Sequence, residues 1–395
     1  MSTYKGTIGI LTGGGDVPGL NPAIRAVTLR ALKEGYRVLG IRRGWAGIVD
    51  VVPEDVEGQA EHVIELDTMT VNKVGRSGGT FLHTSRTKPS RLPKAYIPEH
   101  IQDQYTEEIN DVTPQVLKNI ESLGIDYLIP IGGDDTLSYG ARLHEEGVKV
   151  VAIPKTMDND VPGTDYCIGF STCLTRTIEL THRLRTTAGS HERFLVIEVF
   201  GRYAGFTALL PTMGGAANRC VIPEHPLDIE LLCELLTQDR RENPSNYSVV
   251  LISEGATLAG DSGMYFEDGE TDQYGHKKLG GIGSQVAKLL KELSPKYNNG
   301  RTINVVSQQL SYLMRSGDPD ALDSIVPMVY GNIAFDCIQA GHSGRLVNLR
   351  NGTYDNVPID VVMGKKVIDV AKYYSTERLR PLYKTFSGHP LFIMA

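Results

Sequence analysis

The chain has 395 residues, with 40 Lys and Arg against 47 Asp and Glu, which gives a net charge of −7. This acidic balance argues against nucleic-acid binding, which needs a net basic face, and no run of about 18 uninterrupted apolar residues predicts a membrane span. The five cysteines form no CxxC pair and the N-terminal apolar run is too short for a signal peptide, so we expect reduced thiols in a cytoplasmic protein.

Apolar runs and helical patterns alternate along the chain. Residues 7–11 form a continuous apolar run, which a glycine-rich loop and a helical pattern over residues 20–31 follow. The same order recurs, with strands expected at 36–41, 126–131, 148–153, 194–199, 218–222, 248–252 and 303–306, and helices at 114–123, 136–146, 172–185, 227–236 and 282–293. Strands that lack hydrophobic–polar alternation and are separated by helices are typical of covered parallel sheets. We therefore predict an α/β fold with doubly wound parallel sheets.

The length predicts two or three domains at about 150 residues each. A soft boundary is expected near Gly163, with more than one crossing of the chain between the lobes left open. It gives lobes of residues 1–163 and 164–346 and a partly helical C-terminal extension of residues 347–395. Residues 87–111 are polar and contain three prolines, so we expect them to form a surface insertion in the first lobe.

The first glycine-rich loop, TGGGDVPGLN, lies between an expected strand and an expected helix and begins at Thr12. Glycine lets backbone N–H groups approach an anion, and a helix N-terminus that points at the anion favours its charge. The loop alone is as consistent with a tight strand-to-helix turn as with phosphate binding. Pro18 stands where the dinucleotide fingerprint GxGxxG has its last glycine, which argues against a nicotinamide-binding oxidoreductase.

A second loop, IGGDD, follows the expected strand at residues 126–131. Gly132 and Gly133 leave room for a ligand, and Asp134 and Asp135 stand at the start of a helix. A single Asp in such a place is often a helix cap. Two adjacent carboxylates beside two glycines indicate more, and Asp134 is a candidate ligand for Mg²⁺, which prefers carboxylates together with substrate phosphates.

A third loop, PKTMDND, follows the expected strand at residues 148–153. It supplies a cation, a hydroxyl group and two carboxylates, from Lys155, Thr156, Asp158 and Asp160. Because the carboxyl ends of parallel strands meet at one edge of a sheet, we expect the three loops to form one phosphate and metal site rather than three unrelated turns. Phosphoryl transfer needs positioning, charge neutralisation and a carboxylate that faces the attacking hydroxyl, so Asp158 is the candidate general base.

Seven motifs occur in the order GGGDVPGLN, GGTFLHTSR, GGDD, PKTMDNDVPGTDYCIGF, SHER, EVFGRYAG and ISEG, and this series resembles the 6-phosphofructokinase family. The resemblance implies two α/β lobes with the active site between them, the first binding the phosphoryl donor and the second the sugar phosphate. It implies donor contacts from Gly14, Gly15, Arg86 and Gly133, with Asp134 as the ligand of the Mg²⁺ cofactor. It also implies that Thr156 and Asp158 contact the sugar and that Asp160 supports this site. Asp158 would take the proton from the 1-hydroxyl group.

For fructose 6-phosphate, the resemblance implies contacts from Arg193, Phe200, Gly201, Arg202, Glu254, Tyr312 and Arg315. A planar guanidinium suits phosphate, although a surface salt bridge is the commoner role of a lone arginine. In related enzymes the arginine of the SHxR motif often reaches a neighbouring subunit, which implies a homo-oligomer, either a dimer or a tetramer. Phe200 stands where the family usually has Met.

Two residues distinguish the phosphoryl donor. Members that use ATP usually have glycine at the positions of Asp135 and Lys155, whereas members that use pyrophosphate have this Asp–Lys pair. A carboxylate at position 135 would repel the α-phosphate of ATP, and a cation at position 155 would stabilise charge on the shorter pyrophosphate. The alternative interpretation is that Asp135 caps its helix and that Lys155 is a surface cation.

The sequence thus predicts reversible, pyrophosphate-dependent phosphorylation of fructose 6-phosphate, with Mg²⁺ as cofactor. Three alternatives stay open, namely an ATP-dependent member of the same family, a regulatory subunit without activity, and a nucleotide-binding enzyme such as an NAD kinase. The presence of Asp134, Asp158 and Asp160 argues against an inactive subunit.

Overall fold

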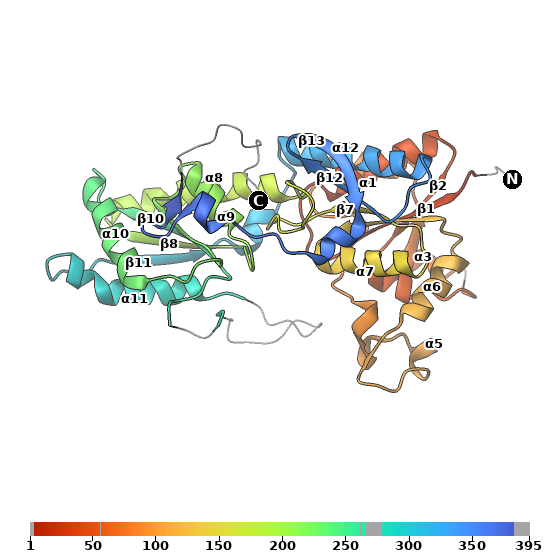
Figure 1. The fold of residues 1–395 in the computed structure, drawn as a ribbon, viewed down its shortest axis with the longest axis horizontal. Coiled ribbons are helices and arrows are strands. Elements are labelled where there is room, and N and C mark those ends of the chain that lie inside the picture. Colours follow the sequence, from red (N-terminus) through yellow and green to blue (C-terminus); the bar gives the residue numbers. More distant parts are fainter. Residues whose placement is uncertain (1–3, 56, 261–262, 266–278, 383–395) are drawn as a thin grey trace. The chain divides into compact units, whose positions relative to one another are not determined.

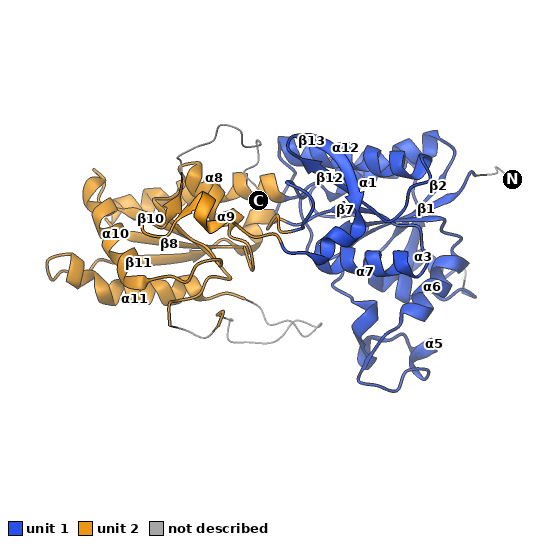
Figure 2. Cartoon of the chain, viewed as in Figure 1, with its two compact units in different colours: residues 1–156, 161–169, 316–365 blue, residues 157–160, 170–315, 366–395 orange. Residues whose placement is uncertain are grey.

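The computed structural model describes residues 4–55, 57–260, 263–265 and 279–382 (Figure 1). The chain divides into two compact units (Figure 2). Unit 1 comprises Met1–Thr156, Val161–Gly169 and Ser316–Lys365, and unit 2 comprises Met157–Asp160, Phe170–Arg315 and Lys366–Ala395.

Unit 1 is built on a sheet in which the structure describes seven strands, in the order β13-β12-β7-β6-β1-β2-β3. These strands are β1 (Thr7–Thr12), β2 (Arg37–Ile41), β3 (Val63–Glu65), β6 (Tyr127–Gly132), β7 (Val151–Pro154), β12 (Arg345–Arg350) and β13 (Thr353–Pro358). β2, β1, β6, β7 and β12 pair in parallel, and the antiparallel β3 and β13 lie at the edges. In this register Ile8 lies opposite Val38 and Tyr127, so β1, β6 and β7 end at the same edge of the sheet.

Helices cover both faces of this sheet (Figure 1). They are α1 (Leu20–Lys33), α2 (Trp45–Val49), α3 (Gln59–His62), α4 (Thr68–Val74), α6 (Thr113–Ser122), α7 (Asp134–Glu145) and α12 (Ala321–Gln339), with the 3₁₀ turn η4 (Ile359–Met363). α1 buries residues at helical spacing, among them Leu20, Ile24 and Val27, and packs along α12. In the described part of the chain α12 is the one helix long and apolar enough to cross a membrane, but half of it is buried inside the protein, as in a core helix.

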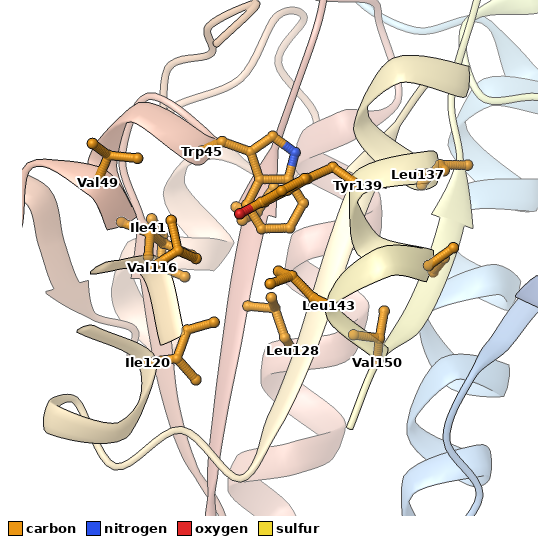
Figure 3. Packing of buried hydrophobic residues seen from close by; sticks show 14 of the residues in the cluster. Ile41, Trp45, Val49, Val116, Ile120, Leu128, Leu137, Tyr139, Leu143 and Val150 are labelled. Carbon is orange, nitrogen blue, oxygen red and sulfur yellow. The ribbon is translucent and has the colours of Figure 1, made fainter. Parts of the chain in front are cut away.

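On the opposite face, α2, α6 and α7 pack on the sheet around Trp45 (Figure 3). The Trp45 ring meets the Tyr139 ring edge to face, with 4.9 Å between centroids, and Leu128 lies beneath them. Strands buried on both faces need no hydrophobic–polar alternation, which explains the continuous apolar runs of the sequence. The α/β prediction with parallel sheets is confirmed.

Residues 87–111 have regular structure of their own. They contain η1 (Pro89–Arg91), β4 (Leu92–Pro93), η2 (Lys94–Tyr96), α5 (Glu99–Gln102) and β5 (Ile109–Asn110), and β4 pairs with β5 in antiparallel fashion. Leu92, Ile97 and Ile101 are buried and belong to the core of unit 1. The segment is therefore more than the surface insertion that its polar composition indicated, because a few apolar side chains anchor it.

Unit 2 has a parallel sheet whose four described strands have the order β11-β8-β10-β9. The strands are β8 (Phe194–Val199), β9 (Arg219–Val221), β10 (Ser248–Ser253) and β11 (Val305–Gln309). The helices are α8 (Phe170–Ser190), α9 (Phe206–Met213), α10 (Ile229–Glu242), α11 (Ile282–Tyr297), η3 (Ser311–Arg315) and α13 (Val370–Tyr373), and a small hairpin joins β14 (Tyr374–Ser375) to β15 (Arg380–Pro381).

The division into units differs from the soft boundary expected near Gly163, and the chain crosses between the units more than once, as the sequence had left open. The chain passes between units five times, after Thr156, Asp160, Gly169, Arg315 and Lys365. The cause lies in strand pairing, because β12 joins β7 in the sheet of unit 1 and carries residues 316–365 with it. Of the expected C-terminal extension, residues 347–365 therefore belong to unit 1 and the following described residues to unit 2, while residues 383–395 lie outside the described chain.

Candidate active site

The loop after β1 has a conformation that only glycine adopts easily. Gly14 has a φ of +79°, and a Cβ atom on Gly13 would lie 2.4 Å from the Thr136 Oγ1 atom. The Gly13 N–H donates to the Ile131 carbonyl and the Gly14 N–H donates to the Ser85 carbonyl, at 3.0 and 2.8 Å. The loop is thus held against β6 on one side and against residue 85 on the other.

The segment after residue 83 is tied to the same loop. The Thr84 hydroxyl donates to the carbonyl oxygens of Thr12 and Gly14, at 3.1 and 2.7 Å. Two residues further along, the Arg86 side chain is exposed. A basic residue is therefore carried on a backbone segment that is anchored to the glycine loop.

The GGDD loop joins β6 to α7. A Cβ atom on Gly132 would lie 2.4 Å from the Thr136 Cβ atom, so the strand and helix approach too closely for a larger residue. Gly133 occupies the N-cap position of α7, and Asp134 and Asp135 are exposed in its first turn. Asp135 is therefore not the helix N-cap, and its carboxylate instead lies 2.7 Å from the Lys88 ammonium.

Lys155 is a buried residue at the end of β7, with 3% of its surface exposed. Its Nζ atom donates to the Gly15 carbonyl oxygen at 2.6 Å, and its backbone N–H donates to the Gly132 carbonyl at 2.9 Å. The alternative that Lys155 is a surface cation is therefore wrong. Its ammonium group instead contacts the backbone of the loop after β1, at the Gly15 carbonyl oxygen.

Unit 1 thus gathers one set of the residues that the sequence singled out. The set lies on the loops after β1, β6 and β7 and on residues 84–86, which are hydrogen-bonded to the first of these loops. It comprises Gly14, Gly15, Arg86, Gly133, Asp134, Asp135, Lys155 and Thr156. It offers a glycine-rich backbone, the buried Lys155 ammonium, the exposed Arg86 guanidinium and two carboxylates. Such a combination can bind a phosphate chain together with a divalent cation.

Unit 2 gathers a second set around Asp158, which is partly buried. A backbone N–H of Arg202 bonds to the Asp158 carboxylate. Burial raises the pKa of Asp158 well above its usual range, and the negative charges of Asp160 and Glu254 raise it further. The Arg202 guanidinium acts in the opposite direction and lowers that pKa.

The loops after β8 and β10 are joined by backbone hydrogen bonds. The Glu254 N–H donates to the Val199 carbonyl at 2.8 Å, and the Gly255 N–H donates to the Gly201 carbonyl at 3.1 Å. Gly201 has a φ of +126°, and a Cβ atom on Gly255 would lie 1.9 Å from the Arg202 carbonyl oxygen. The two loops are therefore in close contact, which fixes the charges that surround Asp158.

Arg315 lies beside two aromatic rings. Its guanidinium carbon is 4.7 Å from the Tyr312 ring centroid and 5.8 Å from the Phe200 ring centroid. The two rings are 6.3 Å apart and nearly perpendicular. Because an aromatic face attracts a cation, the rings restrain the guanidinium of a partly exposed arginine.

Arg193 is separate from this second set within the same chain. It comes just before β8, whereas Phe200 and Arg202 come just after it. A strand of six residues rises about 3.3 Å per residue, which separates the two ends by roughly 20 Å. Lys88 could not be singled out from the sequence, because its ion pair with Asp135 joins two loops that no local motif connects.

Comparison with known proteins identifies relatives along most of the chain. The family model described as Phosphofructokinase matches residues 7–338. The pyrophosphate–fructose 6-phosphate 1-phosphotransferase of Streptomyces coelicolor is 37% identical over 369 residues, which cover 93% of this chain and 97% of that protein. The ATP-dependent 6-phosphofructokinase of Mycobacterium bovis is 35% identical over 368 residues, which also cover 93% of this chain and 97% of that protein.

Solved structures share the fold. Phosphofructokinase from Saccharomyces cerevisiae matches with a TM-score of 0.71 at 22% identity and covers 91% of this chain, but this chain spans only 45% of the yeast chain. The pyrophosphate-dependent phosphofructokinase of Marinobacter aquaeolei matches with a TM-score of 0.72 at 17% identity, over 96% of this chain and 89% of that one. Since the family model and the sequence relatives both span most of its length, the chain belongs to the phosphofructokinase family.

Proposed function

We propose that this phosphofructokinase uses pyrophosphate to phosphorylate the 1-hydroxyl group of fructose 6-phosphate. The observation that carries the proposal is the buried Lys155 ammonium, 2.6 Å from the Gly15 carbonyl oxygen. A cation held inside the loop suits a short, highly charged donor. The Asp135 carboxylate on the neighbouring loop disfavours a longer donor, because the additional phosphate of a nucleotide would approach a like charge.

The donor-binding roles in this proposal belong to unit 1. The donor phosphates would lie against the backbone of Gly14, Gly15 and Gly133, because a glycine has no side chain to block their approach. Arg86 would bind a phosphate through its planar guanidinium. Lys155 would stabilise the negative charge that accumulates on the leaving phosphate.

Asp134 would hold Mg²⁺ in this proposal. It is exposed at the first residue of α7, and among the described residues no three His, Cys, Asp or Glu side chains gather into a metal site. A single carboxylate fits Mg²⁺, which is commonly bound by one or two protein carboxylates and by substrate phosphates. When bound there, Mg²⁺ would neutralise charge on the donor phosphates.

Asp158 would be the general base on the acceptor side, with Thr156 and Asp160 supporting the sugar. Its carboxylate takes the proton of the 1-hydroxyl group as that oxygen forms a bond to the transferred phosphorus. The bond between this phosphorus and the bridging oxygen breaks, and inorganic phosphate leaves. A raised pKa makes Asp158 a stronger base, provided that the solution pH keeps the carboxylate ionised.

The remaining residues of unit 2 would bind the sugar phosphate. Phe200, Gly201, Arg202 and Glu254 come from the two joined loops, and Arg315 is held by Tyr312 and Phe200. Arg193 lies at the other end of β8, which supports the proposal that it serves a neighbouring subunit of a dimer or tetramer. We further propose that the enzyme is cytoplasmic and works in both the glycolytic and gluconeogenic directions, since pyrophosphate and the product ester are comparable donors.

Removing the aromatic face beside Arg315 should weaken the binding of fructose 6-phosphate. We expect Phe200→Ala to raise the KM for this sugar about two- to fivefold with little change in kcat, because an exposed cation–π contact contributes about 0.5–1 kcal/mol. Steady-state kinetics with varied fructose 6-phosphate measure the effect. Phe200→Met is the matched control, since it fills the space without an aromatic face, and equal KM values for Phe200→Met and wild type would contradict the role of the ring.

An ATP-dependent 6-phosphofructokinase is the second candidate. Relatives with that name are 35% identical to this chain, nearly as similar as the relatives named for pyrophosphate. A regulatory subunit without activity is the weaker possibility within the same family.

A comparison of donors with the purified chain separates these functions. We expect kcat/KM for pyrophosphate to exceed that for ATP by about 500- to 1000-fold, since the repulsion by Asp135 is worth about five- to tenfold and the buried Lys155 cation about 100-fold in the same direction. Formation of fructose 1,6-bisphosphate with each donor, at saturating fructose 6-phosphate and Mg²⁺, gives the ratio. Rapid turnover with ATP and none with pyrophosphate would establish the second candidate, and no turnover with either donor would indicate the regulatory subunit.

A further inference from the structure

The ion pair between Lys88 and Asp135 joins two loops of unit 1. The Lys88 Nζ atom lies 2.7 Å from the Asp135 Oδ1 atom, and 38% of the lysine side chain and 62% of the aspartate side chain are exposed. An exposed pair of this kind contributes little to folding. Its position beside the glycine loop suggests a role in binding instead.

The backbone around Lys88 is anchored at both ends. On one side, Thr84 and Ser85 bond to Gly14. On the other side, the Lys88 carbonyl accepts a hydrogen bond from the Arg91 N–H at 2.9 Å, within the turn η1. The Lys88 backbone is therefore held in place without Asp135, so the ammonium group stays within reach of the start of α7 when that partner is removed.

We propose that Lys88 is a specificity-determining residue. Its ammonium group is able to bind a phosphate of a nucleotide, and its ion pair with Asp135 prevents this binding. This inference rests on the proposed function, in which Asp135 stands where a nucleotide would place its additional phosphate. Asp135 then acts against a nucleotide in two ways, because its carboxylate repels the phosphate and it also occupies the one cation 2.7 Å away that would otherwise attract it. Pyrophosphate is shorter and relies on Lys155, so it does not need Lys88.

The inference changes what Asp135→Gly is expected to do. The substitution removes a repulsive charge and at the same time releases the Lys88 ammonium, which then binds the additional phosphate. Any gain in nucleotide affinity therefore depends on Lys88. In the wild-type background the lysine is occupied, so its loss gives no comparable change in nucleotide affinity.

A double-mutant cycle tests this dependence. The four proteins are wild type, Lys88→Met, Asp135→Gly and the double variant, and the measured quantities are the affinity for a non-hydrolysable ATP analogue with Mg²⁺, by calorimetry, and kcat/KM with each donor. We expect the double variant to bind the analogue about tenfold more weakly than Asp135→Gly, as for the loss of one charge-assisted hydrogen bond. Lys88→Met alone should not strengthen this binding and should weaken it by less than about fivefold, because it only leaves the Asp135 carboxylate unneutralised, at a cost of about 1 kcal/mol or less.

Two further variants control for charge and for geometry. Asp135→Gly combined with Lys118→Met removes the same charge from the exposed surface of α6 and should retain the affinity of Asp135→Gly. Asp135→Gly combined with Lys88→Arg should also retain it, because the cation is conserved. Equal analogue affinity in Asp135→Gly and the Lys88→Met double variant would overturn the inference. The proposed function is judged separately, by the donor that the wild-type enzyme prefers.

Discussion

Asp158→Asn is expected to lower kcat by at least about 100-fold, the smaller end of the range for general acid–base catalysis, while the folded protein becomes more stable. Catalysis is lost because an amide cannot accept the proton of the 1-hydroxyl group. Stability rises because burial and the negative charges of Asp160 and Glu254 disfavour the ionised carboxylate, which is the reason for its raised pKa. Steady-state kinetics and urea denaturation measure the two effects on the same pair of proteins.

The sign of the stability effect follows from the direction of the shift. A folded pKa above the unfolded value of about 3.9 means that the folded protein gains stability as pH falls through the folded pKa, and that the gain is complete below the unfolded value. The wild type should therefore be less stable than Asp158→Asn at neutral pH, and the difference should shrink on acidification. A variant that is less stable than the wild type at neutral pH would contradict the proposed environment of Asp158.

The same shift predicts how activity depends on pH. The base must be ionised, so kcat/KM should fall on acidification at a higher pH than for an ordinary carboxylate. Glu254→Gln removes one of the charges that raise the pKa of Asp158 and should move this fall to lower pH. An unchanged acid limb in Glu254→Gln would mean that a group other than Asp158 is responsible.

Asp135→Gly combined with Lys155→Gly is expected to raise kcat/KM for ATP about five- to tenfold and to lower it for pyrophosphate about 100-fold. The carboxylate of Asp135 is 62% exposed, so its repulsion of a phosphate 4 Å away is nearer the value of about 1 kcal/mol in water than that of a buried pair. Lys155 is buried, and the loss of a buried charge-stabilising donor costs a factor of about 10² to 10³. Initial rates with each donor give both values.

The single variants separate the two charges. Asp135→Gly alone should raise ATP use and leave most of the pyrophosphate activity, whereas Lys155→Met should lower pyrophosphate use. Methionine is the matched control for glycine at position 155, because it fills the buried space beside Gly15 without a charge. If the ratio of kcat/KM for pyrophosphate to kcat/KM for ATP were the same in the double variant as in the wild type, other residues would select the donor.

Much of the secondary structure could be predicted from the sequence, because it depends on local patterns. The strands of the two sheets that are buried on both faces, such as β1 and β8, appear as continuous apolar runs, and α1 and α11 appear as apolar residues at helical spacing. β12 and β13 did not stand out. They form an antiparallel pair at the edge of the sheet, and β13 is mostly exposed or half-buried, so no long apolar run marks it.

The candidate site could be predicted in part. The glycines and carboxylates of the loops lie close to the strand ends that carry them, so their motifs indicate both the residue types and the place. The burial of Lys155 could not be predicted, since it depends on contact with Gly15, 140 positions earlier in the chain. The partner of Asp135 could not be predicted either, because Lys88 comes from a segment whose path is set by bonds to the glycine loop.

The sequence by itself therefore determined the α/β class, the parallel strands and the three loops rich in glycine or charged residues, because each depends on neighbouring residues and on the fact that parallel strands end at one edge. Only the tertiary structure decided which segments form each unit, which charges surround Asp158, and that Lys155 is buried while Asp135 is paired. These features depend on the pairing of strands and loops that are distant in the chain. The free energy of such contacts comes from burial and from fixed charges. It cannot be predicted from a local pattern, because the residues that make the contacts are far apart in the chain.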